Sequence, residues 1–156
     1  MDTLYIGHFR ATEKSNCTLH LDTCTGHLVD CLREWDTLTE SQMFWNNISL
    51  TSDGPLAPNN GYSYSQMQQV WFAANATKSN VVLWWWKPDG LDELFAKTDY
   101  ELQPIFLPPP TEDCEQNRVT NVERCSVDIL DRIGKPIGSC GQPAHSLQKI
   151  VASSLF

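Results

Sequence analysis

Long apolar runs and basic clusters are both missing from this sequence. The longest apolar run, Val81 to Trp86, has the length of a β-strand and is far short of the roughly 20 residues of a membrane helix. Lys and Arg total 11 against 19 Asp and Glu, which gives a net charge of −8 and a pI near 4.8. With no basic stripe to neutralise phosphates, the chain is not expected to bind nucleic acid or an anionic membrane surface.

Catalytic motifs are also missing. The chain has no G-x-S-x-G, no H-E-x-x-H and no phosphate-cradling glycine loop, and none of its four His is paired with an evident nucleophile. An enzyme is therefore not expected, and neither is a cofactor.

What the chain does have is enough apolar content for a core, 41% of 156 residues, together with features of the secretory pathway. Six cysteines, an even number, lie in two groups with none between, which favours disulfides in an extracellular or cell-surface protein. Three N-x-S/T sequons make a glycoprotein plausible. The start lacks the regions of a secretory signal, so we expect a fragment of a longer receptor or transporter. The disulfide candidates are Cys17, Cys24, Cys31, Cys114, Cys125 and Cys140, with a loop closed between Cys114 and Cys125, and the glycosylation candidates are Asn16, Asn47 and Asn75.

One alternative use of the first cysteines is a zinc site. A Cys-x-x-His unit repeats every seven residues from Cys17 through His20, Cys24 and His27 to Cys31, and on a helix all five would share a face. The Thr and Gly content disfavours that helix, and an oxidising compartment favours disulfides. We therefore predict no metal site.

Two parts are expected along the chain: a Cys-rich N-terminal segment or insertion, residues 1–36, and a partial α/β domain, residues 37–156. In the second part, apolar spacing predicts a helix from about Thr37 to Asn46-Asn47, capped by Thr39 or Ser41, before a turn-rich loop.

The pattern then alternates between helices and strands. We predict a helix from Ser63 or Ser65 to about Lys78, a strand over 81–86, a short helix from Asp89, a strand over 101–107 and a final helix over 142–155. This order predicts an α/β fold with a parallel-type sheet and flanking helices. Ligands of such sheets bind beyond the carboxyl ends of the strands.

Trp84, Trp85 and Trp86 occupy that position. Three indoles are bulky for a purely structural strand, and each N–H needs a partner, so some are expected to serve a ligand. On a strand Trp84 and Trp86 share one face and Trp85 points to the other, into the core.

Residues 49–110 resemble the substrate-binding domain of glycine betaine ABC transporters, which has the type II periplasmic-binding fold. The resemblance rests on a Gly-containing loop before a helix, a Val-rich strand, and the turn Trp86-Lys87-Pro88 followed by a short helix and a strand that leads into Pro. Cys140-x-x-Pro143 with Leu147-x-Lys149-Ile150 fits the return segment of that family. The resemblance implies one lobe and its return, in a eukaryotic-looking extracellular version, and assigns Trp86 to the ligand.

The function implied is recognition of a quaternary ammonium compound, such as glycine betaine or choline, for transport or sensing, with a membrane permease or receptor segment as a further partner. Aromatic faces bind such cations, and a cage needs several rings. A ligand carboxylate would meet backbone N–H groups at 64–66. The alternative is a disulfide-stabilised ectodomain that binds a protein and no small molecule. The cage candidates are Trp86, Trp84, Tyr62, Tyr64 and Trp45.

Overall fold

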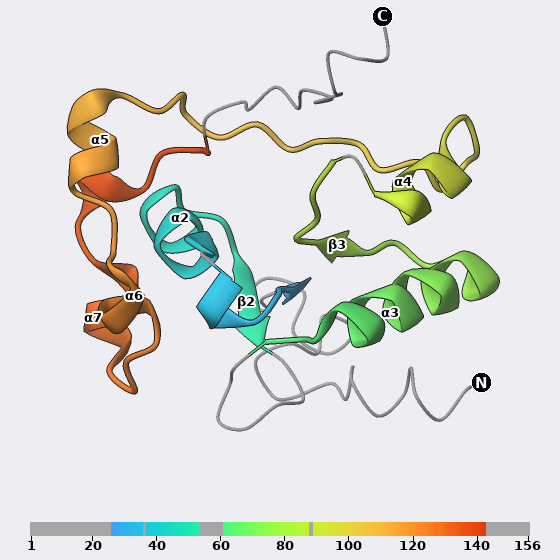
Figure 1. The fold of residues 1–156 in the computed structure, drawn as a ribbon, viewed down its shortest axis with the longest axis horizontal. Coiled ribbons are helices and arrows are strands. Elements are labelled where there is room, and N and C mark those ends of the chain that lie inside the picture. Colours follow the sequence, from blue (N-terminus) through green and yellow to red (C-terminus); the bar gives the residue numbers. More distant parts are fainter. Residues whose placement is uncertain (1–25, 36, 54–60, 88, 143–156) are drawn as a thin grey trace, which may run out of the picture.

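A small parallel sheet flanked by helices organises the chain in the computed structural model, which describes residues 26–35, 37–53, 61–87 and 89–142 (Figure 1). The strands are β1 (Gly26–Val29), β2 (Leu50–Asp53) and β3 (Val82–Leu83), in the order β2-β1-β3. Parallel neighbours need crossover connections, and helices supply both of them. The expected mixed α/β class with a parallel sheet is confirmed.

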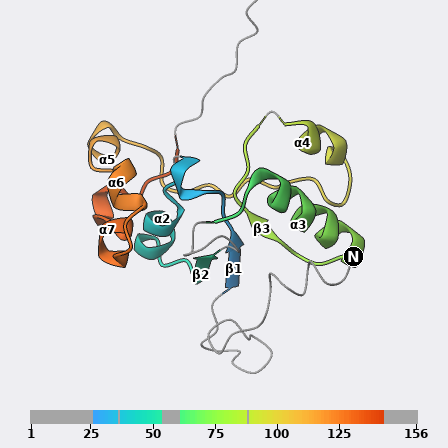
Figure 2. The ribbon, with the colours of Figure 1, turned by 60° about the horizontal axis from the view of Figure 1, so that its bottom comes forward.

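The middle strand β1 pairs with both neighbours. Gly26 lies opposite Leu50 in β2, and Leu28 lies opposite Val82 in β3. A Cβ at Gly26 would meet the Leu50 side chain at 2.5 Å, so only glycine fits there without a shift. Figure 2 shows the strands between α2 on one side and α3 on the other.

The long helix α3 (Tyr64–Thr77) follows its sequence signals closely. Ser63 caps it in a capping box with Gln66, and Lys78 ends it in the left-handed conformation. Its buried face consists of Met67, Val70, Trp71 and Ala74, at helical spacing. The predicted helix and its Ser63 cap are confirmed.

The helix α2 (Thr39–Trp45) connects β1 to β2 and ends where it was expected, at Asn46. Its cap differs from the prediction: the N-cap is Leu38, which makes no side-chain cap hydrogen bond. The hydroxyl of Thr39 instead donates to the carboxylate of Asp30, just after β1. The local pattern predicts that Thr39 caps the helix, but its side chain makes a tertiary contact with Asp30 instead.

Beyond β3 the chain forms fewer strands than expected. Only Val82–Leu83 of the predicted strand over 81–86 pairs, and residues 101–107 have no regular structure, so the second predicted strand is wrong. The short helix α4 (Gly90–Phe95) is confirmed, with Asp89 accepting from the N–H of Leu91. The predicted helix over 142–155 lies almost wholly outside the described residues.

Two apolar clusters form the core. The first joins β1 to α3 and to the chain around Tyr62, and residues 81 and 83–86 pack against it. The second lies between α3 and α4, where Trp71 stacks on Phe95 with ring centroids 5.0 Å apart. Trp85 packs against both clusters and so links the sheet to α4.

Residues 26–35, which the sequence assigned to an N-terminal segment outside the core, lie at its centre. They form β1, the middle strand, and the 3-10 turn η1 (Arg33–Trp35). Val29 and Cys31 are fully buried. A boundary at residue 36 would therefore divide the sheet.

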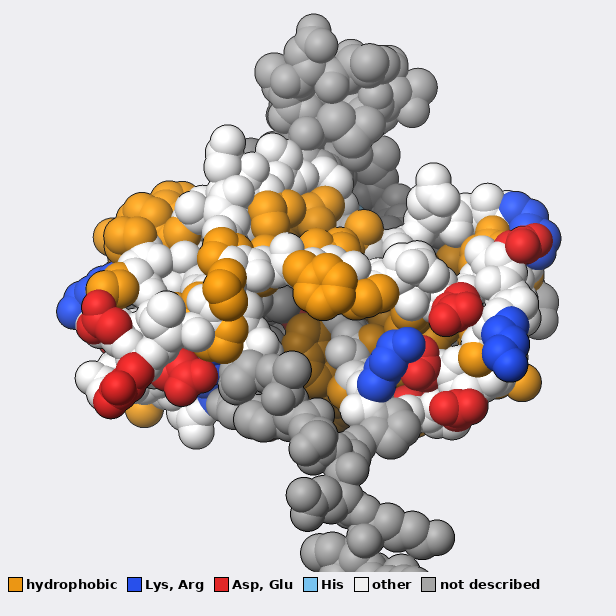
Figure 3. Space-filling model, turned by 90° about the horizontal axis from the view of Figure 1, so that it is seen from above, with side chains coloured by type: hydrophobic (Ala, Val, Ile, Leu, Met, Phe, Trp, Pro, Cys, Tyr) orange, Lys and Arg blue, Asp and Glu red, His pale blue; other side chains and the backbone are white. Residues whose placement is uncertain are grey.

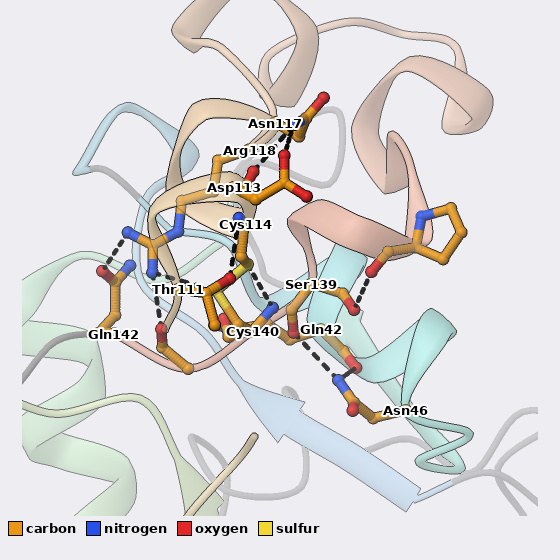
Figure 4. Close-up of a disulfide and its surroundings, with 12 residues drawn as sticks. Gln42, Asn46, Thr111, Asp113, Cys114, Asn117, Arg118, Ser139, Cys140 and Gln142 are labelled. Atoms are coloured by element: carbon orange, nitrogen blue, oxygen red, sulfur yellow. Dashed lines mark hydrogen bonds between the residues drawn. A yellow bond between two sulfur atoms is a disulfide. The ribbon is translucent and has the colours of Figure 1, made fainter. Parts of the chain in front are cut away.

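The chain then crosses to a separate helical unit, residues 111–142, on the far side of α2 (Figure 1). It contains α5 (Glu112–Gln116), α6 (Asn121–Arg124), α7 (Ile129–Ile133) and the 3-10 turn η2 (Pro136–Gly138). A disulfide between Cys114 and Cys140 joins α5 to the end of the unit (Figure 4). The expected loop between Cys114 and Cys125 is wrong, since Cys125 is an exposed free thiol.

Polar contacts attach this unit to α2. The Gln42 amide donates to the Cys140 carbonyl at 2.8 Å, and the Asn46 amide donates to the Ser139 carbonyl at 3.1 Å. Beside them Glu40 pairs with Arg132 at 2.7 Å and with Arg33 at 3.2 Å. All three side chains of this ion cluster are largely buried, so the cluster holds the unit and η1 against α2.

The remaining predictions on cysteines and location have mixed outcomes. Cys31 is a buried free thiol, and Cys17 and Cys24 lie outside the described residues. Within the described ranges, no helix is long and apolar enough to cross a membrane. The disulfide is compatible with an extracellular location.

Candidate functional site at the carboxyl edge of the sheet

Aromatic side chains gather where the parallel strands end. Trp84 to Trp86 follow β3 directly, η1 follows β1, and Tyr64 is the first residue of α3. An isolated bridge between Cys31 and Tyr62 brings the start of α3 beside the end of β1. The carboxyl edge of the sheet therefore carries one aromatic cluster, made of Trp35, Tyr64, Trp84, Trp85 and Trp86.

The rings of this aromatic cluster touch one another. Trp86 stacks on Trp85 at 4.8 Å and lies 5.5 Å from Tyr64 and 5.4 Å from Trp84. Trp35 meets Trp86 edge to face at 6.2 Å. At these spacings no cation fits between the rings, so the aromatic cluster is an open platform and not an enclosed cage. Trp35 is 38% exposed, and the other members are half-buried.

Tyr64 is held in place by a hydrogen bond to α4. Its hydroxyl donates to the Asp89 carboxylate at 3.1 Å, and its ring stacks on Trp85 at 5.7 Å. Partial desolvation and then this bond raise the pKa of Tyr64, which keeps the phenol neutral. The Asp89 carboxylate thus caps α4 and also fixes one ring of the aromatic cluster.

Two of the predicted site residues lie elsewhere. Tyr62 is buried in the core, 1% exposed, and its hydroxyl is hydrogen-bonded to His27 at 2.9 Å. Trp45 lies at the end of α2, and its indole N–H donates to the Ile133 carbonyl at 2.9 Å. Both side chains serve structural contacts. The structure brings together Trp84, Trp86 and Tyr64 of the five candidates.

Trp35 is the member of the aromatic cluster that the sequence reading missed. The run Leu28-Val29 followed by Asp30 indicates a short strand that ends in a polar residue. That strand would have placed Trp35 just after a strand end. The nearby cysteines and turn residues masked that pattern.

A buried carboxylate lies beneath this edge. Asp30, 2% exposed, accepts from Thr39, from Ser52 at 2.7 Å and from the N–H of Cys31 at 2.9 Å. Burial raises the pKa of Asp30 despite these three donors, and the charge of Glu40 adds a little. The hydroxyl of Thr39 in α2 and that of Ser52 in β2 both donate to Asp30, so this carboxylate connects the two elements to the end of β1.

The predicted modification and metal positions are only partly described. Asn47 is exposed, Asn75 is half-buried and accepts from Lys78 at 3.4 Å, and Asn16 lies outside the described residues. His27 and Cys31 belong to β1 and the chain after it, so the single helical face of the zinc alternative is not formed there. Among described residues no cluster of His, Cys, Asp or Glu could hold a metal ion.

The open space near the tryptophans lies on another side of β3. A groove of about 780 Å³ runs between residues 81–85 on one wall and residues 99–105 on the other, with Trp71 between them. Trp84 and Trp85 line it, whereas Trp35, Tyr64 and Trp86 do not. The groove therefore shares two members with the aromatic cluster and does not include the other three.

Comparison of the chain with protein-family models, curated proteins and solved structures gave no match.

Proposed function

We propose that this chain is an extracellular solute-binding module that contacts a quaternary ammonium group, as in choline or glycine betaine, on the outer faces of Trp86, Trp35 and Tyr64. The observation that carries the proposal is the position of these rings at the carboxyl edge of a parallel sheet, where ligands of α/β proteins bind. A quaternary ammonium needs no hydrogen-bond partner and is attracted by aromatic faces.

The rest of the site supports the same ligand class. The net charge of −8 favours a cation over an anion. For a ligand that also carries a carboxylate, we propose the N–H groups of Tyr64 and Ser65 at the start of α3 as donors. The N–H of Gln66 is excluded because it already bonds to Ser63. Each exposed ring contributes roughly 0.5 to 1 kcal/mol. With three rings, we expect a dissociation constant on the order of 10 mM for this chain.

The test is an NMR titration with choline, in which the indole N–H signals of the six tryptophans report separately. Trp35, Trp84 and Trp86 should shift, while Trp45 and Trp71 serve as internal controls because they lie in other contacts. The neutral isostere 3,3-dimethyl-1-butanol separates cation binding from simple apolar contact. Equal shifts with the isostere, or a response that survives Trp86→Ala, would contradict the proposal.

A second candidate function is a protein-interaction module. Large apolar side chains are exposed beside the groove: Ile105 is 70% exposed and Phe106 is 88% exposed. Figure 3, which looks onto the side crossed by residues 101–110, shows hydrophobic side chains gathered over its middle. Large apolar side chains that are exposed next to one another are typical of binding surfaces. Selection of peptides on the intact protein, described below, tests this candidate.

A further inference from the structure

Within the described part of the chain, the outer edge of β3 has no paired strand. The sheet order β2-β1-β3 leaves β3 with one neighbour. The N–H of Trp84 donates to the Val29 carbonyl at 2.9 Å, and Val29 lies opposite Leu83 in the register. Because backbone groups alternate along a strand, those of Val82 and Trp84 face β1 and those of Leu83 face away from it.

Across the groove, residues 102–105 of the opposite wall also lack a backbone partner among the described residues. Residues 102–107 make no backbone hydrogen bond with the described part of the chain through their N–H groups, although their sequence pattern favours a strand. Two extended segments thus face each other across the groove and do not pair directly.

The groove walls suit apolar side chains. Trp71, Trp84, Trp85 and Tyr100 present aromatic surface, and Leu102 and Ile105 add aliphatic surface. The indole N–H of Trp85 is buried and has no acceptor within the described residues. Apolar surface beside free backbone groups is the combination that peptide-binding strand edges use.

The charges around the groove favour a basic occupant. Asp99 and Glu101 lie on the wall, and no described Lys or Arg side chain forms an ion pair with either. Of the two lysines on the wall, Lys87 pairs with Asp92 at 2.9 Å and Lys78 lies over the Tyr100 ring at 4.8 Å. With Asp92 included, three carboxylates lie around the groove against the two lysines Lys78 and Lys87.

We infer that this groove binds an extended polypeptide strand, with alternating apolar side chains and a basic residue beside them, which pairs with the outer edge of β3 through the backbone of Leu83. The inference deepens the second candidate function, since it names the partner class and the mode of binding. It does not depend on Trp35, Tyr64 or Trp86, the rings of the first proposal.

The experiment begins with selection of random heptapeptides displayed on phage against the intact, oxidised protein. Binding of the enriched peptide is then measured for four variants. Leu83→Pro removes the outward N–H, which edge strands tolerate, and Leu83→Ala keeps that N–H while removing the side chain. Ile105→Asp places a charge on the apolar wall. Val127→Asp, at a residue that is 92% exposed and not on the groove wall, is the surface control.

We expect Leu83→Pro and Ile105→Asp to weaken binding about tenfold or more, and Leu83→Ala and Val127→Asp to change it by less than about threefold. N-methylation of the peptide backbone should weaken binding at the one position whose N–H donates to the Leu83 carbonyl and not at the two positions beside it, because neighbouring N–H groups of a pairing strand point away from β3. Circular dichroism melts identify any variant that fails to fold, and the N-methyl series on the wild type keeps the test valid in that case.

The outcomes separate the mode of binding from the function. Failure to enrich any peptide overturns both the inference and the second candidate function. A peptide whose binding is lost with Ile105→Asp but shows no position-specific effect of N-methylation keeps the protein-binding function and overturns strand pairing.

Discussion

Trp85 and Trp86 stack face to face, with ring centroids 4.8 Å apart and 12° between their planes. Adjacent side chains of a strand point to opposite faces, so this stacking shows that the chain leaves the strand conformation immediately after Leu83. The expectation that Trp85 points away from Trp86 is wrong, although Trp85 does pack into the core. The departure places Trp86 against Trp35 and Tyr64, and so creates the aromatic platform.

The stack of Trp71 on Phe95 predicts a large loss of stability on truncation. Trp71 is 1% exposed, so Trp71→Ala should lower the free energy of unfolding by about 3 to 5 kcal/mol. Phe72 is the matched control, since it is the next residue of α3 and is 44% exposed, and Phe72→Ala should cost less than about 1.5 kcal/mol. Urea denaturation measures both. Similar losses for the two variants would show that α3 does not pack by this face.

The Cys114–Cys140 disulfide should be a major source of stability for the helical unit. For a sequence separation of 26, the chain-entropy estimate is about 3.5 kcal/mol. Replacing both cysteines by Ser should lower the free energy of unfolding by about this amount, measured by urea denaturation under oxidising conditions. Cys125→Ser is the control and should change stability little, because that thiol is exposed and unpaired. Destabilisation by Cys125→Ser equal to that of the double variant would contradict the observed pairing.

Glu40 should stabilise the attachment of residues 111–142 to α2. Glu40→Gln leaves Arg132 and Arg33 largely buried without a counter-charge, and we expect a loss of roughly 2 to 4 kcal/mol. The exposed Glu112, whose side chain accepts a hydrogen bond from Gln116 of its own helix, gives the control Glu112→Gln. Chemical denaturation compares the two, and equal small effects would show that the ion cluster contributes nothing net.

Asp30 predicts a pH dependence of stability with a definite sign. Burial raises its folded-state pKa above the ordinary value of 3.8, so the folded protein holds this proton to a higher pH than the unfolded chain. As pH rises from about 4 through the raised pKa, Asp30 therefore lowers the free energy of unfolding. Asp30→Asn cannot ionise, so its stability relative to wild type should increase over that pH range, measured by urea denaturation at a series of pH values.

Glu123 supplies the control of opposite sign. Hydrogen bonds from the backbone and side chain of Thr120 hold its pKa below the ordinary value of 4.5, so its contribution is present above that pH and is lost as pH falls through the lowered pKa. Glu123→Gln should therefore lose stability relative to wild type as pH rises through this range. The same trend in both variants would rule out the assignment for Asp30.

The helices α3 and α4 were predictable because their signals are local, whereas α5, α6 and α7 were not predicted although Thr111, Thr120 and Asp128 cap them. The Ser63 capping box and the Asp89 cap act within a few residues of the helix that they start, and both operate as the sequence indicates. Thr39 shows the limit, because its hydroxyl bonds to Asp30 and leaves α2 without a side-chain cap. A distant acceptor cannot be read from local sequence.

The site was predictable only in part for the same reason. The three consecutive tryptophans after a Val-rich strand indicated where the aromatic cluster forms, but Tyr62 lies in the core and bonds to His27, and Trp45 bonds to the Ile133 carbonyl 88 residues later. Trp35 comes from η1, which follows β1, and the sequence did not reveal that strand among the cysteines and turn residues. The partner of Cys114 likewise depended on the fold, which places Cys140 beside it.

The sequence by itself determined the class of fold, the helices α3 and α4, and the presence of several aromatic rings after β3, because periodicity, caps and composition act over short stretches of chain. Tertiary structure alone decided which rings meet, which cysteines pair and which strand edges stay open. Those outcomes depend on contacts between segments tens of residues apart, as between Trp35 and Trp86. The chain ends the third strand after two residues, and this early end gives both the stacked platform and the unpaired edge beside it.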